Sequence, residues 1–432
     1  MTPQASFMIV APVLPGREGE LRRVLAGMND SPGHANPANP HVPFGALESL
    51  HFARFVILDD ATTADIGVFG VPVQTYPLAL AFLGDFDGNR RAFMRDLVSR
   101  AAPGLRLIFR HCEGFTDSTD LARWLDDHEH RPAAFYTNWR GRTMRQVREE
   151  SALATALASY LRTDQTVTGR PAGEIYAAVR RHVQSEVAAG RLTFTPEQPT
   201  PLTWKIANLV NLLVLPVLGL LLLPLLLLYL PFFAYQVRRR EKTDPDIVPP
   251  IDPAHAARLA EIEDREVTNQ FNAMGSVKPG RFRHWLLVLV LWLIDWGARH
   301  LYFHGRLARV DTIHAARWVF LDGGRRVLFA SNYDGSLESY MDDFINKVAF
   351  GLNLAFGNGV GYPRTRWLVL DGAKDEQNFK KVLRRHQLPS DVWYNGHAGL
   401  TAQQLERNYR LRRGIESTSL SNAELVDWCR LL

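Results

Sequence analysis

The chain contains nearly the same stretch of residues twice. "HFARFVILDDA" begins at His51, and "HAARWVFLDGG" begins at His314. Other pairs follow in the same order: "FMIVAPVLPGR" with "FNAMGSVKPGR", "LALAFLGDFDG" with "RVLFASNYDG", and "AFYTN" with "VWYN". Matches that keep one order along most of each half indicate an internal duplication, and a duplication constrains the fold more than any single motif.

Each half is expected to follow the order β-α-β-β-α-β, which is the ferredoxin-like plan. Residues 105–112 and 364–372 are taken as the fourth strands. The second strand is apolar at nearly every position, which predicts that both of its faces are covered. A ferredoxin-like sheet carries helices on one face only, so the two open faces are expected to pack together. The predicted fold is α+β, with two ferredoxin-like repeats forming a pseudo-dimeric α/β barrel.

The segment Ile206–Tyr235 carries no charged residue. If both repeats lie on one side of a membrane, this segment must enter and return. Folded in half, each arm would span about 22 Å, less than the ~30 Å hydrocarbon core. We therefore predict a re-entrant apolar hairpin, and a single tilted span is the alternative. Candidate bends lie at Pro216, Gly219, Pro224 and Pro231.

Basic residues flank the apolar segment, with Lys205 before it and Arg238–Arg240 after it. This pattern places both ends on the cytoplasmic face of the cell inner membrane. A second apolar segment, 284–303, occupies the place of the first helix in the second repeat. We expect it to lie on the membrane surface, because a helix between two paired strands cannot leave them on opposite sides of a bilayer. A true span is the alternative.

The predicted domains follow these boundaries. Repeat 1 covers 1–140, a helical connector 141–200, the membrane-embedded segment 201–240, a charged linker helix 241–266, repeat 2 267–415 and a C-terminal tail 416–432.

The composition narrows the classes of partner. The net charge is +5 and the pI is about 9.2. The arginines cluster beside the apolar segment, which favours anionic lipid headgroups over nucleic acid. Two cysteines, Cys112 and Cys429, provide neither a disulfide framework nor a zinc motif. Membrane lipids are therefore the expected partners, and no nucleic acid is expected.

Polar side chains near the strand ends of the second half are the candidate site. "GNGVGYPRTR" is a glycine-rich loop that ends in arginines, which suit a carboxylate or a phosphate. Strand alternation puts His314 and Trp318 on one face and Arg317 on the other. The candidate catalytic residues are Asp334, His397 and Arg317. The candidate ligand-binding residues are His314, Asn332, Tyr333, Asn358, Arg364, Arg366, Tyr394 and Asn395. A histidine and an arginine at a strand start can equally hold a neighbouring loop.

The stretch "HAARWVFLDGGRRVLFASNYDGSLESYMDDFINK" resembles an uncharacterised family of bacterial membrane-associated proteins with a duplicated ferredoxin-like domain. The plan is similar to that of the dimeric α/β-barrel superfamily, which includes dye-decolourising peroxidases. "GDFDG" (Gly84–Gly88) also matches the G-x-x-D-G motif of those haem enzymes. A strand-to-helix turn with an Asp N-cap explains that motif equally well. The resemblance implies haem or peroxide chemistry in this chain or in a partner oxidoreductase.

Two functions of different class follow. The first is a membrane-associated module that binds a lipid or another hydrophobic small molecule, or docks an enzyme at the membrane. The alternative is a membrane-bound, haem-dependent, peroxidase-like oxidoreductase that acts on a hydrophobic substrate. The peroxidase proximal His and catalytic Arg have no residue-by-residue match here, which favours the first function.

Overall fold

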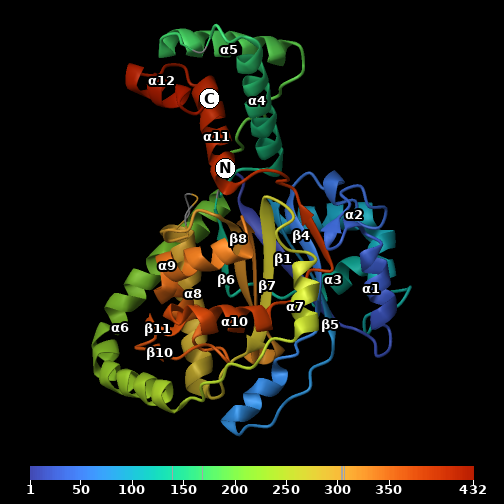
Figure 1. Cartoon of the computed structure of the whole chain (residues 1–432), viewed down its shortest axis with the longest axis vertical. Helices are drawn as coiled ribbons and strands as arrows, with labels where there is room; N and C mark the ends of the chain where they lie inside the picture. The colour runs from blue at the N-terminus through green and yellow to red at the C-terminus, as the bar shows by residue number, and fades with distance from the viewer. Residues whose placement is uncertain (139, 168, 303–304, 306) are drawn as a thin grey trace.

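The computed structural model describes residues 1–138, 140–167, 169–302, 305 and 307–432. The chain has an α+β fold, as predicted. Two β-sheets lie in the centre with helices outside them, and a group of helices projects from one end (Figure 1). A long curved helix runs along the outside of the body.

The two sheets exchange strands between the halves of the chain. In the first sheet the order is β1 (Gln4–Pro12), β5 (Ala79–Asp87), β4 (Leu50–Leu58), β12 (Val392–Asn395), β3 (His34–Ala35) and β2 (Asn29–Ser31). In the second it is β6 (Ala134–Thr137), β8 (Ile313–Leu321), β9 (Arg326–Asp334) and β7 (Thr268–Ser276). Strand β12 pairs with β4, and β6 pairs with β8. Each half therefore completes the sheet of the other.

Alternation along the strands divides the apolar side chains between two kinds of core. Phe7 and Phe82 face outward into a cluster with α1 (Glu18–Ala26), α2 (Arg90–Phe109) and α3 (Leu121–Asp127). Val56 and Val319 face inward, into a cluster that contains residues of both sheets. The outer face of the second sheet packs against α8 (Arg281–His300), α9 (Leu337–Phe356) and α10 (Glu376–His386). The sheets therefore meet through their inner faces.

The projecting group contains four helices: α4 (Met144–Thr163), α5 (Ala172–Ala188), α11 (Ala402–Glu416) and α12 (Asn422–Cys429). Helices α4 and α11 each begin with a capping box, made by Thr143 with Gln146 and by Thr401 with Gln404. A separate apolar cluster holds the four helices together. Residues 422–429 of the predicted tail therefore form a packed helix.

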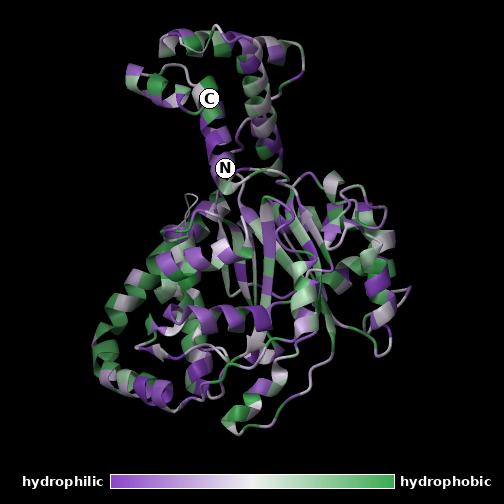
Figure 2. Ribbon diagram, in the orientation of Figure 1, coloured by the Kyte–Doolittle hydropathy of each residue, from purple (hydrophilic) through white to green (hydrophobic). Residues whose placement is uncertain are grey.

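The apolar segment is one continuous helix, so the predicted hairpin is wrong. Helix α6 spans Leu202–Thr243 and is the one helix in the described part of the chain long and apolar enough to cross a membrane. Its prolines lie inside the helix, which is visibly curved and mostly apolar (Figures 1 and 2). The physical reason is that prolines can bend a helix, where neighbouring carbonyls tolerate the lost hydrogen bonds, without reversing it.

Both ends of α6 are attached to the same body. Near its start, Asn211 O accepts a hydrogen bond from Trp296 Nε1 at 3.2 Å, and Asn211 Oδ1 contacts His300 Nε2 at 2.8 Å. Near its end, Arg240 lies over the ring of Phe282 at 4.4 Å from the centroid. Residues 220–232 between these contacts are all exposed. Helix α6 therefore arches along α8 in the opposite direction.

Three further elements differ from the predictions. Residues 105–109 belong to α2 instead of forming a strand. Residues 364–372 form only the short pair β10 (Thr365–Arg366) and β11 (Leu370–Asp371). The fourth strands are β6 and β12 instead. Helix α8 packs one face on the second sheet and exposes Trp285 and Leu289 on the other, while Phe303 of the predicted segment lies outside the described residues. The remaining elements are α7 (Pro253–Ala260) and the 3₁₀ helices Phe44–Ala46, Thr63–Phe69, Asp322–Gly324 and Gly372–Lys374.

Candidate functional site

Two equivalent β-bulges place histidines between the sheets. The pairing of β4 with β5 skips His51, and the pairing of β8 with β9 skips His314. A bulged residue changes the side to which its side chain points. The predicted face of His314 is therefore wrong: the ring lies with the inner-face residue Asp334, not with Trp318 on the outer face.

Five buried side chains form a continuous chain of contacts across the space between the sheets. His51 Nε2 lies 2.7 Å from Asp87 Oδ1, and His314 Nε2 lies 2.7 Å from Asp334 Oδ1. His397 lies between the two histidines, with Nε2 at 2.8 Å from His51 Nδ1 and Nδ1 at 3.4 Å from His314 Nδ1. Each of the five residues is less than a tenth exposed. We call Asp87–His51–His397–His314–Asp334 the histidine chain.

The backbone holds His397 in place. Asn395 Oδ1 accepts a hydrogen bond from the backbone N–H of His397, and Gly396 N–H donates to the carbonyl oxygen of His51 at 2.7 Å. A Cβ atom at Gly396 would lie 2.7 Å from that same carbonyl oxygen, so only glycine allows this approach. Burial, together with the neighbouring His51 and His314, lowers the pKa of His397 well below its usual range.

The two carboxylates also bind the helices of the projecting group. Asp87 Oδ2 accepts a hydrogen bond from the backbone N–H of Met144 at 2.6 Å, and Asp334 Oδ2 accepts one from Ala402 at 2.7 Å. Met144 and Ala402 are the first residues of α4 and α11. The histidine chain therefore connects the bases of these two helices.

A second buried polar group contains the predicted Arg317 and Asn332. Arg317 pairs with Asp85 of the opposite sheet and donates to the carbonyl oxygens of Phe7 and Gly84, each at 3.1 Å. Arg54 makes the equivalent contacts in the other direction, but its side-chain acceptor on β9 is the neutral Asn332. Burial and then Arg317 lower the pKa of Arg54 to about 9, so Arg54 stays charged at neutral pH.

The other predicted residues do not lie in this site. Tyr333 stacks on Tyr340 in the outer core, and Tyr394 stacks on Phe44. Asn358 accepts a hydrogen bond from Arg283. Two arginines bind surface carboxylates: Arg364 lies near Asp246, and Arg366 lies near Asp371. The glycine-rich loop is therefore separate from His397, because the chain between them forms α10 and β12.

Sequence reasoning had not identified Asp85 and Asp87 as members of the site. Both lie in the "GDFDG" motif, where Asp was expected to cap the following helix. The N-cap of α2 is Asn89 instead, and the carboxylate of Asp87 binds His51 and Met144. The signal that could have found Asp87 is its match to Asp334 in the duplicated pattern.

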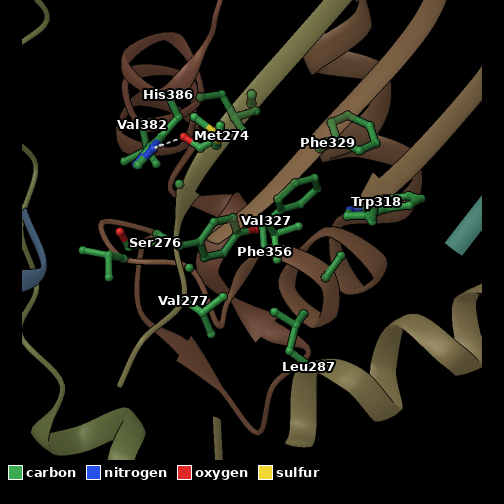
Figure 3. A pocket seen from close by; sticks show the side chains of 17 residues that line it. Met274, Ser276, Val277, Leu287, Trp318, Val327, Phe329, Phe356, Val382 and His386 are labelled. Carbon is green, nitrogen blue, oxygen red and sulfur yellow. Dashed lines mark hydrogen bonds between the residues drawn. The ribbon is translucent and has the colours of Figure 1, made fainter. Parts of the chain in front are cut away.

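An apolar cavity of about 250 Å³ lies between α8 and α9, outside the second sheet. A smaller cavity of about 70 Å³ adjoins it and shares four lining residues, among them Trp318 and Phe329 (Figure 3). The larger cavity is lined by aliphatic and aromatic side chains, two glycines and no charged group. The indole N–H of buried Trp318 has no hydrogen-bond partner in the described residues. Its nitrogen points toward the smaller cavity in Figure 3.

Three carboxylates on the surface come close enough to hold a cation: Glu338, Asp342 and Glu376. The ammonium group of Lys380 contacts all three of them. Hydrogen bonds from these carboxylates raise the pKa of Lys380. A lysine therefore already supplies the positive charge at this position.

Comparison with models of known protein families, with curated proteins and with solved structures finds no match to this chain. Function is therefore argued from the geometry alone.

Proposed function

We propose that this chain is a membrane-associated module that binds a hydrophobic small molecule. In this proposal its body consists of two ferredoxin-like halves packed through their open faces, in the manner of a dimeric α/β barrel. Supporting this, β1, β5 and β4 correspond in order to β7, β9 and β8, and each set is antiparallel. The observation that carries the function is the apolar cavity beside α8 and α9.

The arch of α6 is the surface that meets the membrane. Leu220 and Leu228 are 74% and 80% exposed, and no charged residue interrupts 206–235. At 42 residues the helix would extend about 63 Å, twice the thickness of the hydrocarbon core. Because both ends contact one body, the middle enters the bilayer and returns to the same side. Arg238–Arg240 then face anionic headgroups on the cytoplasmic side.

The cavity is placed to receive a molecule from the bilayer. Leu293 of α8 and Phe350 of α9 line it and are 40% and 50% exposed, so they belong to both the cavity and the surface. An exposed apolar face with an adjoining apolar cavity suits a ligand that partitions into lipid. The unpaired N–H of Trp318 selects a ligand with one acceptor oxygen, such as a carboxylate, ester or ketone, on an aliphatic body.

The haem alternative does not fit the residues that would carry it. All six ring nitrogens of His51, His314 and His397 face another imidazole or a carboxylate. Ligation of iron would break one of these contacts and leave a buried polar group without its partner. We therefore derive no step through haem, and no observation on the described residues supports docking of an oxidoreductase.

Membrane association is tested by flotation of the full chain with vesicles of phosphatidylcholine and phosphatidylglycerol. We expect the wild type to float and a triple variant, Leu220→Lys with Leu225→Lys and Leu228→Lys, to stay at the bottom. Exposed leucines on α6 have few contacts to lose, so folding should be unaffected. The matched control is Val187→Lys with Val426→Lys in the projecting helices, which should float normally. Equal flotation of both variants would contradict the membrane role of α6.

Ligand binding is tested with dansyl-undecanoic acid as a fluorescent probe. Gly351 lines the cavity, and a Cβ atom there meets nothing within 4 Å. Gly351→Leu should fill the space and weaken probe binding at least tenfold, while Gly173→Leu in α5 should not. Trp318→Phe should weaken the acid by about tenfold, close to the 1.5–3 kcal/mol of a hydrogen bond to a charged group, and leave dansyl-undecane unchanged. Equal affinity for Gly351→Leu and wild type would eliminate this cavity as the site.

A further inference from the structure

The histidine chain has more hydrogen-bonding contacts than it has protons. An ionised carboxylate only accepts hydrogen bonds, so His51 and His314 must each donate from Nε2, to Asp87 and Asp334 respectively. If both rings are neutral, each Nδ1 then carries a lone pair directed at His397. Neutral His397 has one N–H to offer to two acceptors. Four contacts therefore share three protons.

The distances show where the fourth proton is missing. The contact from His397 Nε2 to His51 Nδ1 is 2.8 Å, a normal hydrogen bond, so the single N–H of His397 lies there. The contact from His397 Nδ1 to His314 Nδ1 is 3.4 Å, longer than protein hydrogen bonds usually are. Two lone pairs face each other across this gap.

We propose that the histidine chain is a binding site for a single proton, which enters between His397 and His314 and closes that gap. The proton is held on His314 Nδ1, so that His314 becomes an imidazolium between Asp334 and the lone pair of His397. No covalent bond other than N–H forms, and the proton comes from solvent. A shift of the His397 N–H from Nε2 to Nδ1 produces the mirror state, with the imidazolium on His51. This inference does not depend on the proposed ligand function.

The charges around the chain favour uptake of one proton but not of several. With three neutral rings the chain carries two buried negative charges, and one added proton halves that charge. The positive groups that act on His397 are Arg142 and Arg148, while Glu150 pairs with Arg142. The polar neighbours Gln4 and Thr268 contact His51 and His314 at 3.4 Å each and do not titrate. Phe52 covers the rings of both His314 and His397.

The carboxylates connect this proton to the projecting helices. Asp334 accepts the backbone N–H of Ala402, and Asp87 accepts that of Met144. An imidazolium beside Asp334 withdraws charge from the carboxylate and weakens its bond to Ala402. Proton uptake is therefore expected to speed amide hydrogen exchange at Ala402 more than at Met144.

The experiment follows the ring nitrogens of ¹⁵N-histidine in the full-length protein in nanodiscs, from about pH 8 to about pH 5. We expect neutral rings with the proton on Nε2 of His51 and His314 at the upper pH. On acidification, one additional proton should appear on Nδ1 of His314, or of His51 in the mirror state. Two variants separate proton binding from simple packing. His397→Phe removes the lone pair and should abolish the uptake, whereas His397→Gln supplies both an acceptor and a donor and should retain it.

Three results would overturn the inference. The first is that neither His314 nor His51 acquires a proton on Nδ1 over this range. The second is equal uptake in His397→Phe and His397→Gln, with both variants folded at pH 8 by thermal melting. The third is a stoichiometric metal ion in the purified wild type that is lost from His397→Phe, because the gap would then hold a metal instead of a proton.

Discussion

Arg317 of β8 crosses the space between the sheets and forms an ion pair with Asp85 of β5. Both side chains are at most 5% exposed, so the pair is buried. Buried ion pairs add little net stability when complete, but breaking one leaves an uncompensated charge. Arg54, which makes the equivalent crossing, meets the neutral Asn332 instead. The two halves therefore share the crossing geometry but not the charge.

Removing the carboxylate of Asp85 should be costly. In Asp85→Asn, the two buried guanidinium groups share the interface without a counter-ion, so we expect a loss of about 3–5 kcal/mol in the free energy of unfolding. Asn332→Asp should instead supply Arg54 with a counter-ion, and the double variant should recover most of the loss. Urea unfolding measures all three. A change in Asp85→Asn below about 1 kcal/mol would show that water already reaches the pair.

The strand exchange predicts how the chain can be divided. A fragment of residues 1–200 lacks β12, so the edge of β4 is exposed and the fragment should aggregate. A fragment of residues 244–432 lacks β6 and should behave in the same way. Expressed together in the same cell, the two fragments should purify as a stable complex. Soluble, monomeric 1–200 on size-exclusion chromatography would contradict this prediction.

Glu241 holds a strained loop against the end of α6. Its carboxylate accepts hydrogen bonds from the backbone N–H groups of Trp367 and Leu368, which both have positive φ angles. Non-glycine residues in that region store strain, which the surrounding contacts must offset. Glu241→Ala should release the loop, and trypsin should then cleave after Arg366 several times faster. Glu261→Ala, at an exposed position in the linker, is the control that should leave the cleavage rate unchanged.

The two cysteines should differ in reactivity and in their effect on alkaline stability. Cys112 is fully buried, and burial raises the pKa of its thiol to about 12, whereas Cys429 is partly exposed. Iodoacetamide should therefore alkylate Cys429 first in the native protein. The unfolded chain releases the Cys112 proton near pH 8.5 and the folded chain does not, so stability falls as the pH rises between these values. Cys112→Ala should remove up to about 1.4 kcal/mol per pH unit of that loss, measured by urea unfolding from pH 8 to pH 10.

Local patterns in the sequence were sufficient for several elements. Continuous apolar runs placed strands at 50–58 and 313–321, and the charge-free stretch marked α6. Three of the predicted site residues, His314, Asp334 and His397, do lie together. These features depend on residue type and spacing within a short window, which is the information that a sequence displays directly.

The tertiary structure alone decided the rest. Which sheet β6 and β12 join depends on partners far away in the sequence, and no local period encodes that choice. The bulges at His51 and His314 arise from a mismatch between two paired strands, so neither strand reveals them alone. Helix α6 stays continuous because the body holds both of its ends. The sequence thus determined the elements and their burial, while long-range pairing determined that Asp87, His51 and His397 meet.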